Sequence, residues 1–218
     1  MASPGPPVDR FSISIHDRIV AGRKESRALV KASIRASLDA HVQALASLSE
    51  AADTIERIIA SLVQTLSRGG KVLTCGNGGS AAEALHLAEE MMGRFHRDRA
   101  PLAAICLSAD PTALTCIAND YGFEETFARQ VEGLGRKGDA LVALSTSGES
   151  PNIVRALRRA RQLGLTTIGM LGEHGSAAEK WCDLALVLTS MDEAHRQEAH
   201  LMAIHVILEH LDARMPSK

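Results

Sequence analysis

A glycine-rich segment of the chain has the composition of a turn that holds an anion. The segment Gly76–Ser80, with the sequence GNGGS, follows an apolar run and precedes a helical pattern. Glycines let the backbone come close to a ligand, and the free N–H groups at a helix N-terminus favour negative charge. No Gly-Lys-Ser/Thr follows, so this is not a Walker A loop, and the fit to a dinucleotide fingerprint is loose. The segment predicts phosphate binding, with a purely structural turn as the alternative.

A second segment, Ser145–Ser150, carries four hydroxyl side chains within six residues and also follows an apolar run. Pro151 comes next, at a position typical of the first residue of a helix, so Ser150 is expected as the N-cap. Capping needs one hydroxyl, and the others add donors that can surround a phosphate without any arginine. A phosphorylated sugar, with hydroxyls along its length, would use both segments.

Four polar side chains on two helical segments have the types and spacing of metal ligands. His86 and Glu90 are four residues apart, which places them on one face of a helix. An exposed polar pair is an equally good explanation of that spacing. Gln197 and His205 lie about 80° apart around the last helix, so both can face one pocket.

The bulk composition excludes several functions. The 218 residues carry a formal charge of only −2, and aromatic residues make up 3 %. The chain has no basic field and very few side chains that could stack on bases, so we expect no nucleic-acid partner. No apolar run is long enough to span a bilayer, the first residues lack a secretory signal, and the four cysteines form no Cys-x-x-Cys pair. These features predict a cytoplasmic protein with no membrane partner.

The elements that must position these side chains follow from hydrophobic periodicity. Apolar residues recur every three or four positions from Arg27 to Glu50 and again from Ile55 to Leu66, which predicts two amphipathic helices. Short apolar strands then alternate with helical patterns. The expected strands are Val72–Cys75, Leu102–Leu107, Ala140–Leu144, Thr166–Leu171 and Leu184–Leu188. The expected helices are Ser80–Phe95, Thr112–Ile117, Glu124–Gly133, Pro151–Leu163, a short one near Ser176–Trp181, and Glu193–Ala213.

This alternation predicts an α/β fold: a three-layer sandwich with a central parallel five-stranded sheet flanked by helices, preceded by an N-terminal helical pair. Residues 1–26 are expected to form a poorly ordered tail, and residues 27–218 one domain that includes the helical hairpin. Ligands of such sheets bind beyond the carboxyl ends of the strands, where both hydroxyl-rich segments fall.

Taken together and in order, these motifs resemble the phosphoheptose isomerase family of sugar isomerase (SIS) domain proteins. The resemblance runs from about Arg27 to the C-terminus. It rests on the segments 76–80, 86–90 with 93–95, 118–123, 145–148 and 197–200 with His205. It implies a flavodoxin-like SIS domain and the isomerisation of sedoheptulose 7-phosphate to D-glycero-D-manno-heptose 7-phosphate through an enediol, the first step toward ADP- or GDP-heptose for lipopolysaccharide or other surface glycans.

The resemblance also implies roles for individual residues. Glu90 is assigned as the catalytic base and His205 as the acid. The substrate-binding positions are Asn77, Gly78, Gly79, Ser80, Glu90, Asn119, Asp120, Ser145, Thr146, Ser147, Ser150 and Gln197. The implied ligands of one zinc ion per subunit are His86, Glu90, Gln197 and His205. A homotetramer with active sites between subunits is the implied assembly.

Some residues depart from the pattern of that family. Glu149 and Arg196 stand where asparagine and an aliphatic residue are usual, residues 170–174 replace a more hydroxylated turn, and Pro111 interrupts the start of a helix. The alternatives are a non-catalytic SIS-domain adaptor that binds the replication initiator, or an isomerase of another sugar phosphate such as arabinose 5-phosphate. The retained Glu90 and His205 favour the enzyme over the adaptor.

Overall fold

The computed structural model describes residues 15–189 and 192–215, with the backbone alone at residues 15–25 and 47. The chain divides into two compact units, Met1–Val42 and Gln43–Lys218. The long helix α1, Ile15–Glu50, contributes to both. Residues 15–26, expected to belong to a tail, are helical here, and residues 1–14 lie outside the described residues.

In the first unit, α1 carries a row of exposed apolar side chains. Val30, Ile34, Leu38 and Val42 are each more than half exposed and recur at every fourth position. This spacing places them along one face of the helix. An isolated helix with such a face gains nothing from burial, so the row marks a surface that needs a partner.

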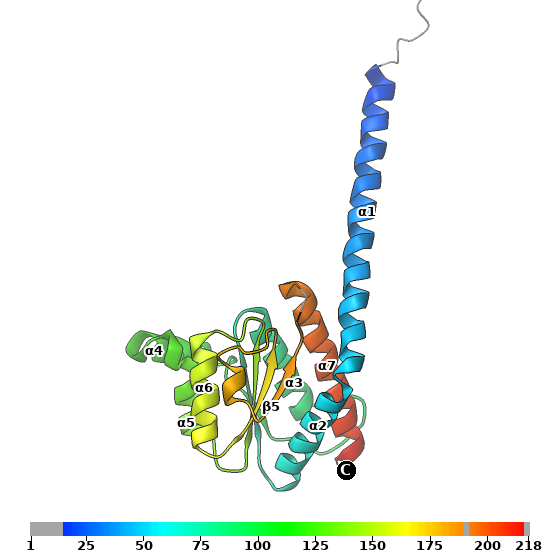
Figure 1. The fold of residues 1–218 in the computed structure, drawn as a ribbon. Helices are drawn as coiled ribbons and strands as arrows, with labels where there is room; N and C mark the ends of the chain where they lie inside the picture. The colour runs from blue at the N-terminus through cyan, green and yellow to red at the C-terminus, as the bar shows by residue number, and fades with distance from the viewer. Residues whose placement is uncertain (1–14, 190–191, 216–218) are drawn as a thin grey trace, which may run out of the picture. The chain divides into compact units, whose positions relative to one another are not determined.

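The second unit is built on a five-stranded sheet, and Figure 1 shows helices on both sides of this sheet. Its strands are β1 Val72–Gly76, β2 Ala104–Cys106, β3 Ala140–Ser145, β4 Thr166–Leu171 and β5 Leu184–Val187. All neighbouring strands pair in parallel, in the order β2-β1-β3-β4-β5. This is the flavodoxin-like strand order, so the fold prediction is confirmed.

Helices cover both faces of the sheet. They are α2 Ala52–Ser67, α3 Gly79–Met92, α4 Pro111–Tyr121, α5 Thr126–Leu134, α6 Pro151–Gln162 and α7 Glu193–Arg214, with short 3-10 turns at Phe123–Glu125 and Glu179–Trp181. Helices α2, α3 and α7 form one hydrophobic core with the sheet, and α5 and α6 form the other. Because both faces are covered, β1 and β3 are buried along their whole length and read as continuous apolar runs.

The start of α4 differs from the sequence-based expectation. Pro111 is the first residue of this helix and does not interrupt it. The Asp110 side chain accepts hydrogen bonds from the backbone N–H groups of Thr112 (2.8 Å) and Ala113 (3.1 Å). A proline suits the first helical position because its fixed φ is already helical and no N–H is needed there.

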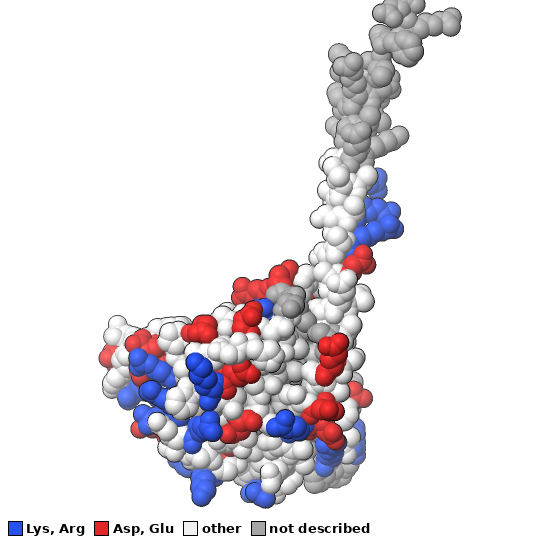
Figure 2. All heavy atoms as spheres, viewed as in Figure 1, with Lys and Arg blue, Asp and Glu red and all other residues white. Residues whose placement is uncertain are grey.

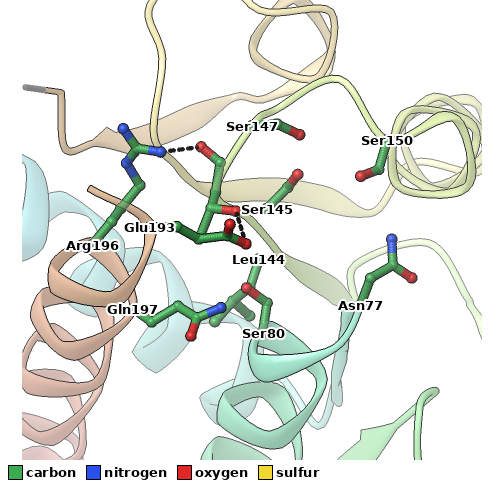
Figure 3. Close-up of a pocket in the computed structure, with 10 residues that line it drawn as sticks. Asn77, Ser80, Leu144, Ser145, Ser147, Ser150, Glu193, Arg196 and Gln197 are labelled. Atoms are coloured by element: carbon green, nitrogen blue, oxygen red, sulfur yellow. Dashed lines mark hydrogen bonds between the residues drawn. The ribbon is translucent and has the colours of Figure 1, made fainter. Parts of the chain in front are cut away.

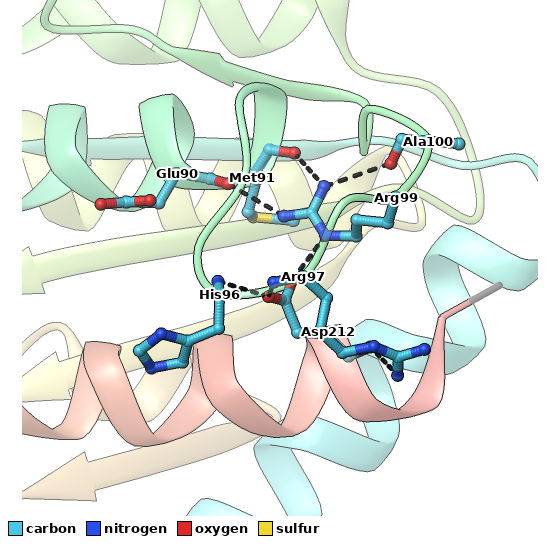
Figure 4. A network of polar contacts seen from close by, with 7 residues as sticks. All are labelled: Glu90, Met91, His96, Arg97, Arg99, Ala100 and Asp212. Atoms are coloured by element: carbon cyan, nitrogen blue, oxygen red, sulfur yellow. Dashed lines mark hydrogen bonds and ion pairs between the residues drawn. The ribbon is translucent and has the colours of Figure 1, made fainter. Parts of the chain in front are cut away.

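A buried ion pair joins the end of α3 to the end of α7 (Figure 4). Arg99 donates from Nε to a carboxylate oxygen of Asp212 at 2.6 Å, and both side chains are at most 2 % exposed. The same arginine donates to the backbone carbonyls of Glu90 and Met91, each at 2.9 Å. The pair therefore fixes the last turn of α3, which carries Glu90, against α7.

The described residues on the face seen in Figure 2 form no charge field of a single sign. Figure 2 shows acidic and basic side chains interspersed over the face in view, in keeping with the formal charge of −2. An anionic ligand must therefore be held by local groups. Among the residues that the structure describes, no helix is both long and apolar enough to cross a membrane.

Candidate active site

The glycine-rich segment Gly76–Ser80 and the hydroxyl-rich segment Ser145–Ser150 meet where the strand order of the sheet reverses. Strand β1 pairs with β3 so that Gly76 lies opposite Leu144, and the two strands lead into α3 and α6 on opposite faces. A crevice forms at such a switch point because neighbouring chains leave in opposite directions. A cavity of about 290 Å³ opens there (Figure 3). Its lining residues are Asn77, Ser80, Leu144, Ser145, Thr146, Ser147, Ser150, Glu193, Arg196 and Gln197.

The first loop leaves space for a side chain of α7, Gln197, to line the cavity. Gly78 precedes α3 with a φ of +55°, which favours glycine. An ideal Cβ on Gly79 would lie 2.5 Å from Nε2 of Gln197, so the missing side chain leaves room for this amide. Gln197 therefore sits against the start of α3, where it can contact a ligand held by the free N–H groups of that helix.

The second loop is ordered by its own hydroxyls. Ser145 Oγ accepts from the N–H of Gly148 at 3.0 Å, and Ser147 Oγ accepts from the N–H of Glu149 at 3.2 Å. Thr146 Oγ1 donates to a carboxylate oxygen of Glu193 at 3.3 Å. Ser150 occupies the N-cap position of α6, but its side chain makes no capping hydrogen bond. The expected capping bond is therefore absent, and Ser150 instead lines the cavity.

Asn152 links the two loops and was missed by sequence analysis. Asn77 Nδ2 donates to Asn152 Oδ1 at 2.9 Å, and Asn152 Nδ2 donates back to Asn77 Oδ1 at 2.8 Å. Asn152 is buried on the first turn of α6. An asparagine directly after a Ser-Pro helix start is the only local signal, and nothing local indicates a partner 75 residues away.

Two of the predicted metal ligands face each other. His86 Nε2 on α3 and His205 Nε2 on α7 are 3.0 Å apart, with their rings edge to face. The ring of Phe95 stacks on His205 at 5.7 Å between centroids. Packing on one side and the facing imidazole on the other thus define the position of His205.

The separation of these two nitrogens is compatible with two ligands of one zinc ion. Two tetrahedral Zn–N bonds of about 2.0 Å place their nitrogens about 3.3 Å apart, close to the separation observed here. His86, Glu89 and Glu90 each offer a ligand atom, and these atoms lie within 4.8 Å of one another. Nδ1 of His86 is 3.7 Å from Glu89 Oε2, a carboxylate placed to orient the ring. Gln197 is turned toward Gly79 and lines the cavity.

Two buried ionisable groups lie on the same helices. Glu83 on α3 is 7 % exposed, and burial raises its pKa to about 7. Neither of its carboxylate oxygens has a hydrogen-bond partner within the described part of the chain. His200 on α7 is fully buried, and burial lowers its pKa to about 4, so its imidazole is neutral at pH 7.

Two predicted substrate-binding residues lie away from the cavity. Asn119 and Asp120 are exposed on α4, where Asn119 Nδ2 donates to Asp120 Oδ1 at 2.8 Å. Neither lines the cavity of this single chain, and within its described residues α4 buries no side chain. Their role in binding remains a prediction.

The strand order and the two loops define the class of this protein: an α/β protein with a crevice suited to an anion at its topological switch point. The SIS domain family profile matches residues 38–172. A phosphoheptose isomerase from Campylobacter concisus is 43 % identical over 184 residues, which cover 84 % of this chain and 97 % of that protein. One from Bradyrhizobium sp. strain BTAi1 is 52 % identical over 159 residues, or 73 % of this chain and 80 % of that one.

Solved structures of phosphoheptose isomerases are also similar to this chain. The structure of a phosphoheptose isomerase from Neisseria gonorrhoeae matches with a TM-score of 0.80 at 34 % identity, covering 84 % of this chain and 99 % of that one. The chain therefore belongs to the phosphoheptose isomerase family of SIS-domain proteins, and it is an isomerase.

Proposed function

We propose that the chain converts sedoheptulose 7-phosphate into D-glycero-D-manno-heptose 7-phosphate. The main support for this proposal is that one helix, α7, contributes residues both to the cavity and to the histidine pair. Gln197 lines the hydroxyl-rich cavity, and His205 faces His86 at 3.0 Å. A ligand whose phosphate lies among the loops can thus extend its carbon chain toward the histidine pair.

Phosphate binding in this proposal uses hydroxyls and helix N-termini. The lining residues Ser145, Thr146, Ser147 and Ser150 surround the start of α6, and Asn77 and Ser80 surround the start of α3. Two helix dipoles with free N–H groups directed at one cavity stabilise a dianion without a salt bridge. The two reciprocal hydrogen bonds between Asn77 and Asn152 fix the positions of the two loops relative to each other.

Isomerisation needs a base for a carbon-bound proton and an acid for the carbonyl oxygen. Glu90 takes the proton from C1 of the ketose while His205 donates a proton to O2, giving the enediol. Glu90 then returns a proton to C2, and the O1 hydroxyl loses its proton to His205 as the aldehyde forms. Each group ends in its starting protonation state. The backbone at Glu90 is held by Arg99, which donates a hydrogen bond to the Glu90 carbonyl at 2.9 Å.

A zinc ion held by His86, Glu90, Gln197 and His205 would compete with the proton transfers for the lone pairs of Glu90 and His205. It would therefore polarise the substrate oxygens, order the site, or leave during turnover. Support comes from the nitrogen separation and from the carboxylates beside His86. The Cα atoms of Gln197 and His205 lie about 12 Å apart along the helix, so a shared ion needs both side chains extended toward each other.

We further propose that the chain forms a homotetramer that works in the cytoplasm and supplies a heptose precursor for lipopolysaccharide or other surface glycans. The exposed row Val30, Ile34, Leu38 and Val42 on α1 is suited to a second copy of the helix. The exposed α4, with Asn119 and Asp120, is suited to complete a neighbouring site. Light scattering of the purified protein measures the number of chains directly.

The substrate assignment is tested by offering a set of sugar phosphates. The zinc-loaded protein is incubated with sedoheptulose 7-phosphate, arabinose 5-phosphate or ribulose 5-phosphate, and aldose or ketose formation is followed by NMR. Conversion of the heptulose in preference to the pentoses supports the proposal. Conversion of arabinose 5-phosphate alone would make it a different isomerase, and no turnover of any substrate would favour the adaptor.

A further inference from the structure

Arg196, on the first turn of α7, connects three strand ends of the second unit. Its Nε donates to the carbonyl of Leu188 at 3.1 Å, just after β5. One terminal nitrogen donates to the carbonyl of Thr146 at 2.9 Å, after β3, and the other pairs with Glu173 at 3.2 Å, after β4. The residue is 8 % exposed and lines the cavity. Figure 3 shows its bond to the loop that carries the serines.

The route of this side chain depends on Gly172. An ideal Cβ at this position would lie 2.0 Å from the carbonyl oxygen of Thr146 and 2.4 Å from Cδ of Arg196. Any side chain at Gly172 would therefore separate the arginine from the loop. The glycine and the arginine form one arrangement that brings α7, the loop after β3 and the loop after β4 together.

The bond to the Thr146 carbonyl sets the direction of a peptide plane. In a trans peptide the carbonyl and the next N–H point in opposite directions, so fixing the Thr146 carbonyl toward Arg196 turns the N–H of Ser147 away from it. Ser145 and Ser147 in turn accept bonds from the N–H groups of Gly148 and Glu149. The arginine thus sets the direction of the Thr146–Ser147 peptide, and the loop's own hydroxyls order the residues that follow.

Arg196 also decides the charge of the cavity wall. Of the ten described residues that line the cavity, Arg196 is the one cation and Glu193 the one anion. The third charge nearby, Glu173, is largely exposed, so solvent screens it more than the buried guanidinium. Arg196 therefore offsets the negative charge of Glu193 and Glu173 beside the loop, and its removal would leave two carboxylates to repel a phosphate dianion.

We infer that Arg196 is a positioning residue for phosphate recognition: it holds the Ser145–Ser150 loop at the Thr146 carbonyl and offsets the negative charge of Glu193 and Glu173 beside the cavity. The inference rests on the proposed function in that it assigns the cavity to the phosphate of the substrate. The competing explanation is a buried arginine that only ties strand ends together and contributes stability.

The test compares phosphate binding with stability in four proteins: wild type, Arg196→Met, Arg196→Lys, and Arg158→Met as the control. Arg158 is an exposed arginine on α6 outside the cavity lining. The dissociation constant of inorganic phosphate is measured by calorimetry, which needs no turnover. The kcat and KM for sedoheptulose 7-phosphate and the melting temperature are measured on the same samples.

We expect Arg196→Met to weaken phosphate binding and raise KM about tenfold, as expected for the loss of a charge-assisted contact, with kcat within about twofold. Arg196→Lys keeps the charge but cannot reach three acceptors in one plane, so about threefold weaker binding is expected. Arg158→Met should match wild type. A lower melting temperature with unchanged phosphate affinity in Arg196→Met would overturn the inference.

If Arg196→Met does not fold, Arg196→Lys decides: phosphate affinity equal to wild type overturns the inference, and about threefold weaker binding supports it. The two proposals fail separately. A wild-type protein that binds phosphate but turns over no sugar phosphate refutes the isomerase and leaves the role of Arg196 testable by calorimetry.

Discussion

Replacing Asp212 by asparagine leaves one acceptor oxygen where the carboxylate offers two oxygens to three donors. The carboxylate accepts from the backbone N–H groups of His96 (2.8 Å) and Arg97 (3.0 Å) and from Arg99 Nε (2.6 Å). Asparagine keeps the shape but has one oxygen, and its amide cannot accept. The Arg99 guanidinium, with a side chain 1 % exposed, would keep its charge without the partner.

The expected loss of stability is large for one atom pair. Breaking a buried ion pair by removing one partner costs about 3–5 kcal/mol, compared with a total stability of about 5–15 kcal/mol. For a chain of this size each kcal/mol lowers the melting temperature by about 2–4 °C, so Asp212→Asn should melt about 6–20 °C lower. Because Arg99 also holds the Glu90 carbonyl, kcat should fall even where the protein stays folded.

Urea unfolding followed by circular dichroism, at one protein concentration, measures this loss. The double variant Arg99→Met with Asp212→Leu should be more stable than either single variant, because no unpaired charge remains buried. A loss below about 1 kcal/mol in Asp212→Asn, as for an exposed pair, would refute the reasoning. So would a double variant whose loss equals the sum of the single ones.

The pH dependence of the same pair has a definite sign. Burial acts to raise the pKa of Asp212, but the N–H groups of Arg97 and His96 and the Arg99 guanidinium outweigh it and lower the pKa. A lowered pKa gives stability that is present above the unfolded value of about 3.9 and is lost as the pH falls through the folded value. The difference between wild type and Asp212→Asn should therefore shrink in acid.

Three further outcomes are expected. The pKa of Glu83 is raised to about 7, so ionisation of this carboxyl opposes folding as the pH rises from about 4.5 to 7. In urea unfolding at pH 8, Glu83→Gln should therefore be up to about 3 kcal/mol more stable than wild type. At pH 4 the two proteins should be equally stable. Gly79→Ala places a Cβ 2.5 Å from Gln197 and should raise the KM for sugar phosphate about tenfold in steady-state assays, whereas an unchanged KM would remove Gln197 from the binding site. His86→Ala should reduce zinc, measured by plasma mass spectrometry after dialysis, from about one ion per chain to less than a tenth, and full retention would place the metal elsewhere.

The sheet and the position of the site could be predicted from sequence because their signals are local. Strands β1 and β3 are apolar runs that end in glycine or serine, and chain order alone places the loops Gly76–Ser80 and Ser145–Ser150 at one edge of a parallel sheet. The 3.6-residue period places His86 and Glu90 on one face of α3. Each inference needs no more than a dozen neighbouring residues.

What sequence could not supply are contacts between residues far apart in the chain. Arg99 and Asp212 read as surface charges, yet they form a buried pair across 113 residues. Asn152 reads as part of an ordinary helix start, and its partner Asn77 is 75 residues away. From sequence, Arg196 was a departure from the aliphatic residue usual in the family, and no function could be assigned to it. Its contacts with Thr146 and Glu173 appear only when three strand ends come together.

The central claim is that the phosphate cavity and the acid–base residues on α3 and α7 form one isomerase site. The most direct test is the rate of sedoheptulose 7-phosphate turnover by Glu90→Gln, with Glu209→Gln, an exposed position on α7, as control. We predict at least a hundredfold lower kcat, as expected for the loss of a general base, with phosphate affinity and melting temperature close to wild type. A Glu90→Gln protein that retains a rate near that of wild type would contradict the claim.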